Sequence, residues 1–358
     1  MRDVIHSGAK NILKNQNGMA LLVTIMTMSV LIAVTVMFHK RSWHSFLVAN
    51  NYKVTTQLKA IGESGIHIGQ EILRQEGKNQ KFDTLQDGWS TLGEDDFGSL
   101  FSDGKLELKI VDLSGRLQIN GLVQTIGKGQ KKGANKGKGK GKGKGKENQE
   151  KNGLQDILFR LLLSGGFGIE EESKARAIVD SLVDWIDKDE RESDRGAESS
   201  YYQALKEPYA CRNGPVQYIE ELLLVKGITP QLLFGEDKKK GLVDFLTVYG
   251  TDGKININTA DTVLLKSFDV LINDELVEKL DSFRTDKKNK DKLGNFDWYL
   301  GTGFWPGDII LNTKILTTQS SFFMIKSKGI HDSLYSMVTA NVHRVNRKKI
   351  ELLSKKVE

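Results

Sequence analysis

Residues Met19–Phe38 read MALLVTIMTMSVLIAVTVMF, twenty positions without a charge. As a helix this stretch would be about 30 Å long, the thickness of the hydrocarbon core of a bilayer. A buried soluble helix is one alternative, but the stretch has too few polar residues for it. A cleaved secretory signal is another, but no small-x-small cleavage site follows. We therefore predict a transmembrane helix over residues 19–40.

The helix is predicted to continue beyond the membrane as an amphipathic one. Past Arg41, apolar residues recur at three- and four-residue intervals up to Ile72, and charged or polar residues fill the other face. An unbroken helix from Met19 to Arg74 would be about 84 Å long. Gly62 and Gly65 lower its helix propensity locally.

The positive charge of the chain is local. The chain has 358 residues, 39% of them hydrophobic, which allows two or three domains and excludes wholesale disorder. Of its net charge of +6, residues 127–146 contribute nine lysines without an acid, and Met1–Lys14 contributes a net +2. Subtracting these eleven charges leaves −5, so the folded part is mildly acidic. The single cysteine, Cys211, excludes an intrachain disulfide and a multi-cysteine zinc site.

Strand patterns bracket a helical block. Residues 104–120 predict a strand, a turn and a strand, and residues 321–346 predict a hairpin that turns around His331-Asp332. The Gly/Lys-rich segment 127–152 predicts a flexible, self-repelling linker, because alternating glycine and like charge cannot form a core.

Two paired helices within the block resemble helix-hairpin-helix units. They lie at residues 216–235 and 254–280, the second with a predicted cap at Thr259. Such units often hold DNA phosphate through a Gly-x-Gly hairpin, which neither segment contains. We therefore interpret the two units as helices that pack within the domain rather than as DNA-binding units.

The residues before the apolar stretch resemble a type IV prepilin leader. Gly18 follows a short basic segment and directly precedes Met19, the position at which a membrane peptidase cuts prepilins. Most pilins carry glutamate at the fifth mature position, where this chain has Val23. That departure is similar to the minor pseudopilin K subfamily of type II secretion, which lacks this glutamate.

Further segments resemble the same family in chain order: DLSGRLQIN (112–120), SLVDWIDKDERESDRGAESSYY (181–202), ELLLVKGIT (221–229) and KININTA (254–260). The chain thus resembles the general secretion pathway protein K family. The resemblance implies an α+β fold, in which a pilin-like long N-terminal helix packs on a small antiparallel sheet. It also implies a large inserted all-α domain with helix-hairpin-helix-like units.

Applied to this chain, the resemblance gives seven segments. They are a prepilin leader (1–18), a transmembrane helix (19–40), a first part of the body (41–122), a linker (127–152), an α-domain (153–315), C-terminal body strands (316–347) and a basic tail (348–358).

The implied function is that of a minor pseudopilin. Prepilin peptidase would cleave between Gly18 and Met19, with N-methylation, and the subunit would sit at the tip of the periplasmic pseudopilus to initiate or cap its assembly during export across the outer membrane. The implied partners are the minor pseudopilins I and J, with H as a further candidate, the major pseudopilin G, the peptidase and inner-membrane lipid. The chain would cross the inner membrane once, with its bulk in the periplasm. No specific nucleic acid is expected.

A rival hypothesis is a bitopic, helix-hairpin-helix nucleic-acid-binding protein of a DNA-uptake apparatus. It would use the paired helices and the Gly/Lys-rich segment, and it would show steep salt dependence. No enzyme is expected, because the histidines are scattered without a His-Glu-x-x-His pair and Cys211 shows no sign of activation.

The acid-rich loop Asp184–Glu198 is the candidate ligand site, because a carboxylate cluster favours a hard cation such as calcium. Aligned to an EF-hand loop, its acids fall at the first, third and twelfth positions. Arg191 and Glu192 occupy the fifth and sixth, and glycine is required at the sixth, so the loop is not an EF-hand.

The family resemblance implies calcium in the α-domain. The expected ligands, in order, are Asp187, Asp189, Asp194 and Glu198. The alternative is a solvated acidic turn paired with Arg191 and Arg195.

Overall fold

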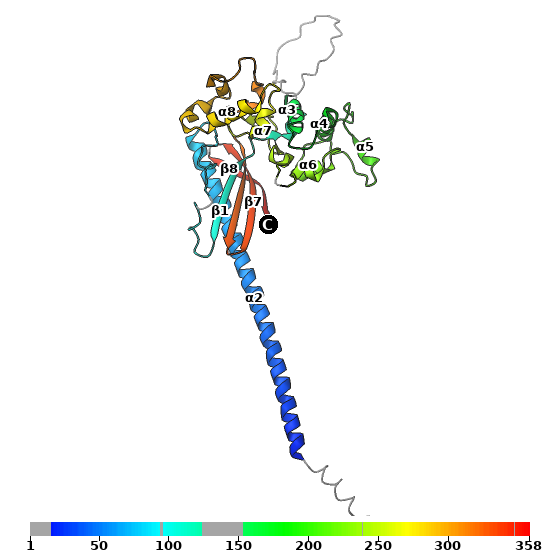
Figure 1. Ribbon diagram of the computed structural model, residues 1–358, viewed down its shortest axis with the longest axis vertical. Coiled ribbons are helices and arrows are strands. Elements are labelled where there is room, and N and C mark those ends of the chain that lie inside the picture. The colour runs from blue at the N-terminus through cyan, green and yellow to red at the C-terminus, as the bar shows by residue number, and fades with distance from the viewer. Residues whose placement is uncertain (1–15, 94–95, 124–152, 238, 347) are drawn as a thin grey trace, which may run out of the picture.

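The computed structural model describes residues 16–93, 96–123, 153–237, 239–346 and 348–358. The predicted linker, 127–152, lies outside these ranges, as does the predicted leader up to residue 15. A long helix, α2 (Gln16–Asn79), leads into a sheet, and the remaining helices lie at the end of the sheet away from the free part of α2 (Figure 1).

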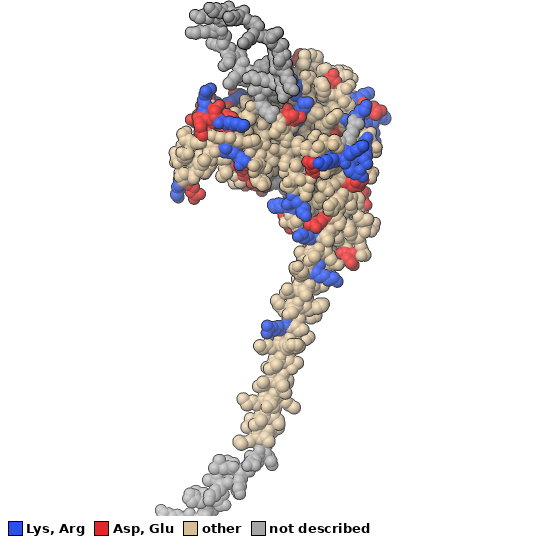
Figure 2. Space-filling model, turned by 180° about the vertical axis from the view of Figure 1, so that it is seen from behind, with Lys and Arg blue, Asp and Glu red and all other residues tan. Residues whose placement is uncertain are grey.

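Helix α2 confirms the predicted continuous helix. Its most apolar window is long enough to span a bilayer, and none of that window is buried in the protein. The helix is exposed up to Lys53, and Figure 2 shows few charged side chains along this free part. From Val54 onward, one face of the helix packs against the sheet.

The body is a four-stranded antiparallel sheet of order β1-β6-β7-β8. Its strands are β1 (Lys105–Asp112), β6 (Phe322–His331), β7 (Leu334–Asn346) and β8 (Lys349–Val357). Alternate residues of β1, β6 and β7 are buried, which is the pattern of a sheet with one covered face. Strands β6 and β7 confirm the predicted C-terminal hairpin.

The predicted basic tail, 348–358, is wrong. Residues Lys349–Val357 form β8, which pairs antiparallel with β7. Its lysines are the side chains of an edge strand, and Lys355 Nζ lies 2.9 Å from Glu63 Oε1 on α2. Charge dominates the composition of this segment and hides its strand pattern.

Glycines let the backbones of helix and sheet approach each other. On α2, Cβ atoms added at Gly62 and Gly69 would lie 2.8 Å from Val338 Cγ2 and 2.9 Å from Ile325 Cγ2. From the sheet side, a Cβ on Gly329 would lie 2.4 Å from the carbonyl oxygen of Leu58, a backbone atom that no rotamer change can move. The position of α2 on the sheet is therefore fixed by backbone contact.

The second domain is mainly helical. Its α-helices are α3 (Gly153–Leu162), α4 (Glu172–Ile186), α5 (Ser199–Gln203), α6 (Pro230–Phe234), α7 (Thr262–Lys266) and α8 (Asp274–Thr285). Its 3₁₀-helices are η1 (Ile119–Gly121), η2 (Ile219–Leu224), η3 (Leu242–Asp244), η4 (Lys287–Gly294), η5 (Trp298–Thr302) and η6 (Thr313–Ile315). Two short parallel pairs complete it, β2 (Leu117–Gln118) with β3 (Leu246–Thr247) and β4 (Ile255–Asn256) with β5 (Leu316–Thr317).

Five details of the prediction need correction. Strand β2 pairs with β3 rather than with β1, and residues 117–122 belong to the core of the helical domain rather than to the body. The parallel pairs mean that this domain is not all-α. In the first paired-helix unit, η2 is a 3₁₀-helix, and in the second, Asp261 rather than Thr259 caps α7 by accepting from Val263 N–H.

Buried polar groups join the two domains. Asp112, at the end of β1, accepts hydrogen bonds from the hydroxyls of Thr259 in the helical domain and Ser320 before β6. Beside it, Asp83, which follows α2, pairs with Arg344 of β7. Burial is the main cause that raises the pKa of Asp112 to about 6, and the neighbouring Asp83 adds to the rise. This junction connects helix, sheet and helical domain in one network.

Replacing Gly329 with alanine should destabilise the protein by about 1–3 kcal/mol, because the added methyl group meets the backbone of α2. Chemical unfolding of the full chain in detergent measures the change. The matched control is Lys326→Ala, an exposed position on the same strand. Equal loss of stability in the two variants would contradict the close packing described here.

Candidate functional site

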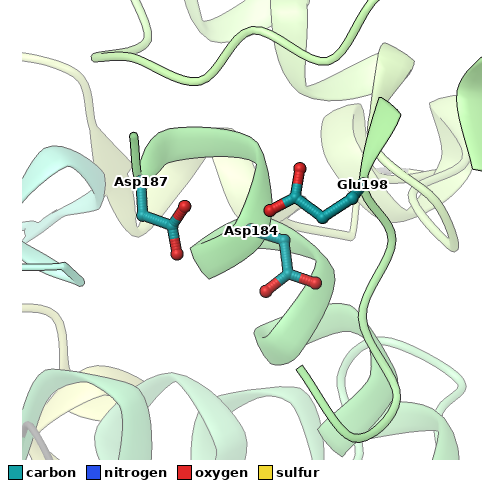
Figure 3. Close-up of side chains that lie close together, drawn as sticks. All are labelled: Asp184, Asp187 and Glu198. Atoms are coloured by element: carbon teal, nitrogen blue, oxygen red, sulfur yellow. The ribbon is translucent and has the colours of Figure 1, made fainter. Parts of the chain in front are cut away.

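Three carboxylates gather where helix α4 ends. Asp184 lies in its last turn, Asp187 is its C-cap, and Glu198 is the N-cap of α5. One oxygen of each lies within 4.8 Å of the others. Figure 3 shows the side chains of Asp187 and Glu198 turned toward each other beside Asp184. Asp184 and Glu198 are buried, and Asp187 is half-buried.

Asp184 holds the loop that returns the chain to the helix. Its Oδ1 accepts from Ser193 Oγ at 2.6 Å, and its Oδ2 accepts from Ala197 N–H at 2.9 Å. A Cβ on Gly196 would lie 1.8 Å from Oδ2, so only glycine fits where the loop passes the carboxylate. The loop is thereby wrapped around Asp184, which places Glu198 next to the helix end.

Glu198 lacks the partners that a buried carboxylate needs. Its side chain is 2% exposed, and neither oxygen accepts a hydrogen bond from the described residues. Burial, followed by the charges of Asp184, Asp187 and Glu190, raises its pKa to about 7, and the nearby Cys211 thiol opposes the rise. Burial and the charge of Asp189 raise the pKa of Asp187 to about 6. The cluster is a site of uncompensated negative charge.

The cluster agrees only in part with the residues expected from the sequence. Asp187 and Glu198 are brought together, whereas Asp189 and Asp194 are exposed and stand outside the group. Asp189 instead accepts from the backbone N–H of Arg191 in a local turn. Asp184 was not among the expected ligands, although its spacing of three residues before Asp187 places both on one helix face.

The alternative of a solvated acidic turn does not describe this cluster. Two of its carboxylates are buried, and among the described residues no ion pair joins them to Arg191 or Arg195. A hard cation fits the donor set, because calcium prefers carboxylate oxygens and Glu198 has two buried oxygens without hydrogen-bond donors. Asp184, Asp187 and Glu198 are the residues that would hold it.

The domain that contains this cluster has known relatives. Residues 115–234 match the family model for type II secretion system (T2SS), protein K. Residues 115–234 are therefore similar to the protein K domain of type II secretion systems. The resemblance noted in the sequence is thus confirmed.

Three curated relatives named "Type II secretion system protein K" are each 26% identical to the chain. They come from Pectobacterium carotovorum subsp. carotovorum (246 aligned residues), Pseudomonas aeruginosa (262) and Aeromonas hydrophila (222). The alignments cover 68%, 70% and 61% of this chain. They cover 66%, 68% and 61% of the relatives, so the chain matches about two thirds of their length.

A solved structure shares the fold. It is a chain in the crystal structure of the GspK-GspI-GspJ complex from the enterotoxigenic Escherichia coli Type 2 Secretion System, with a TM-score of 0.57 and 18% identity. The match covers 87% of this chain and 99% of that chain. It confirms the α+β expectation of a long helix on an antiparallel sheet with an inserted, mainly helical domain. The rival hypothesis of a nucleic-acid-binding protein receives no support from these matches.

In the metal-free protein, lowering the pH from 7.5 to 5.5 should add stability through Glu198. The folded state binds a proton with a pKa of about 7, whereas the carboxyl in the unfolded chain has its ordinary pKa of 4.5, so this contribution is lost as the pH rises through 7. Thermal melts in chelator should therefore show a weaker pH dependence for Glu198→Gln than for the parent. Glu172→Gln, an exposed carboxylate of the same domain, is the control. Parallel pH profiles of Glu198→Gln and the parent would refute the assignment.

Proposed function

We propose that this chain is a minor pseudopilin of a type II protein secretion system, located at the tip of the periplasmic pseudopilus. The proposal rests on one observation. The same chain contains a segment that matches the protein K family model and a long, exposed apolar helix. The helix would anchor the subunit once in the inner membrane and then pack among the helices of its neighbours. The rest of the chain would lie in the periplasm.

The architecture supports a place at the tip. The helical domain lies at the end of the sheet away from the apolar part of α2, where it would obstruct a subunit stacked above (Figure 1). Val23 also offers no carboxylate to pair with a neighbour's N-terminal amine, a charge that is costly to leave unpaired in lipid. One copy at the distal end avoids both problems, because nothing assembles beyond it.

The proposed partners follow from the related complex. That solved structure contains GspK, GspI and GspJ, so the corresponding minor pseudopilins I and J are the first candidates. Minor pseudopilin H, the major pseudopilin G and prepilin peptidase complete the proposed set. The role is structural and has no catalytic step.

Immunogold against the helical domain should label one end of overproduced pseudopili, because the tip accepts one copy. Regular labelling along the fibre would reject this location. Val23→Glu should leave end labelling unchanged, since the obstruction by the helical domain remains. Co-purification of the full chain with minor pseudopilins I and J tests the assembly itself.

Processing between Gly18 and Met19 is part of the proposal. Both residues lie in the first turn of α2, whose N–H groups lack acceptors within the helix, and nothing lies within 4 Å of a Cβ added at Gly18. Intact-mass analysis from cells with the peptidase should show a chain that begins at an N-methylated Met19. Gly18→Leu should stay uncut. A parent chain that still begins at Met1 in these cells would contradict processing.

Calcium is proposed as the ligand of the acidic cluster, where it would neutralise the facing carboxylates. At a hundredfold excess over Kd, calcium should stabilise the chain by about 2.7 kcal/mol. Thermal melts with calcium and with chelator measure this shift, which Asp187→Ala plus Glu198→Ala should abolish. Asp189→Ala plus Asp194→Ala is the matched control and should retain it. Equal melting temperatures of the parent with calcium and with chelator would reject the proposal.

A further inference from the structure

A groove of about 580 Å³ runs along β1, which is one edge of the sheet (Figure 1). Its far wall comes from the segment after α2 and contains Leu85, Trp89 and Leu92. Its near wall contains every residue of β1 from Glu107 to Asp112. The lining also includes Lys326 and Lys328 of β6 and Met337 of β7, so the groove extends from the β1 edge onto the sheet.

The backbone of β1 faces this groove. Leu113 N–H donates to the carbonyl of Phe322 at 2.9 Å, and antiparallel pairing alternates, so the odd-numbered residues of β1 bond to β6. The N–H and C=O groups of Leu108 and Ile110, which line the groove, therefore point to this edge, whereas Leu106 is fully buried and lies outside the lining. The side chains of Leu108 and Ile110 are buried in the core under the sheet, so these residues offer the groove mainly backbone.

Two further features indicate an extended, acidic occupant. The indole N–H of Trp89 is buried and has no acceptor among the described residues. Lys109 and Lys326 line the groove without an ion-pair partner in the described part of the chain, whereas Lys328 already pairs with Glu107 at 3.5 Å. An acceptor and negative charge would complete the site.

The opposite edge of the sheet is protected against pairing. Strand β8 has register shifts against β7, and such irregularities discourage the addition of another strand. Strand β1 keeps an unbroken register with β6 over all eight of its residues. Of the two edges, β1 is the one shaped to accept a strand.

We propose that an extended, acidic peptide segment of a partner protein adds to β1 as a fifth strand of the sheet. Backbone hydrogen bonds to Leu108 and Ile110 would hold it, and its carboxylates would face Lys109. This inference goes beyond the proposed pseudopilin function and does not depend on it.

The probe is a capped, fluorescent peptide of alternating valine and glutamate, titrated against the full chain in detergent micelles. We expect saturable binding and slower hydrogen exchange at the amides of Leu108 and Ile110, with no change at Glu107 and Lys109. Lys109→Glu should weaken binding about fivefold, since attraction becomes repulsion. Lys349→Glu on the far edge is the matched control and should bind as the parent does.

Two comparisons separate strand addition from simple charge attraction. The same peptide with N-methylated valines should lose binding, because it keeps its charge but lacks half of its backbone donors. Lys109→Gln should bind the peptide with an affinity between those of the parent and Lys109→Glu. Equal melting temperatures of the parent and the variants would show that the variants are folded. No saturable binding, unchanged affinity of the N-methylated peptide, or protection in β8 instead of β1 would overturn the proposal.

Discussion

The buried junction around Asp112 is the interaction on which the arrangement of the two domains depends. A carboxylate without water is costly unless donors surround it, and here the donors come from the helical domain and from the segment that enters β6. The neighbouring pair of Asp83 and Arg344 ties the chain after α2 to the sheet. An apolar contact would tolerate sliding, whereas these directional bonds fix one orientation of the helical domain.

The two candidate binding surfaces have a common origin in this arrangement. The acidic cluster forms because a loop of the helical domain is wrapped around Asp184 and returns Glu198 to the helix end. The groove along β1 forms because the segment after α2, held by Asp83, stands beside an unpaired strand edge. In both cases the framework leaves a polar side chain without a hydrogen-bond partner among the described residues, the Glu198 carboxylate in the cluster and the Trp89 indole N–H beside the groove.

Local sequence patterns predicted the parts of the fold that local forces decide. The apolar run from Met19 and the alternation of residues 321–346 required no knowledge of distant contacts, and the structure confirms both elements. Strand β8 and the assignment of residues 117–122 to the helical domain depend on pairing with distant segments. The sequence did not identify Asp184 as a ligand for a similar reason. Its place in the cluster depends on hydrogen bonds from a loop nine to thirteen residues further along the chain.

Helix α2 also has a mechanical consequence. Between Phe38, where the apolar stretch ends, and Val54, where contact with the sheet begins, the helix stands free for about 24 Å. It is one uninterrupted rod, and glycines seat its far half directly on the sheet backbone. A displacement of the apolar end along the helix axis would therefore pass to the sheet and, through the Asp112 junction, to the helical domain. The continuous helix thus makes a stiff connection between the apolar end and the folded domains, not a flexible one.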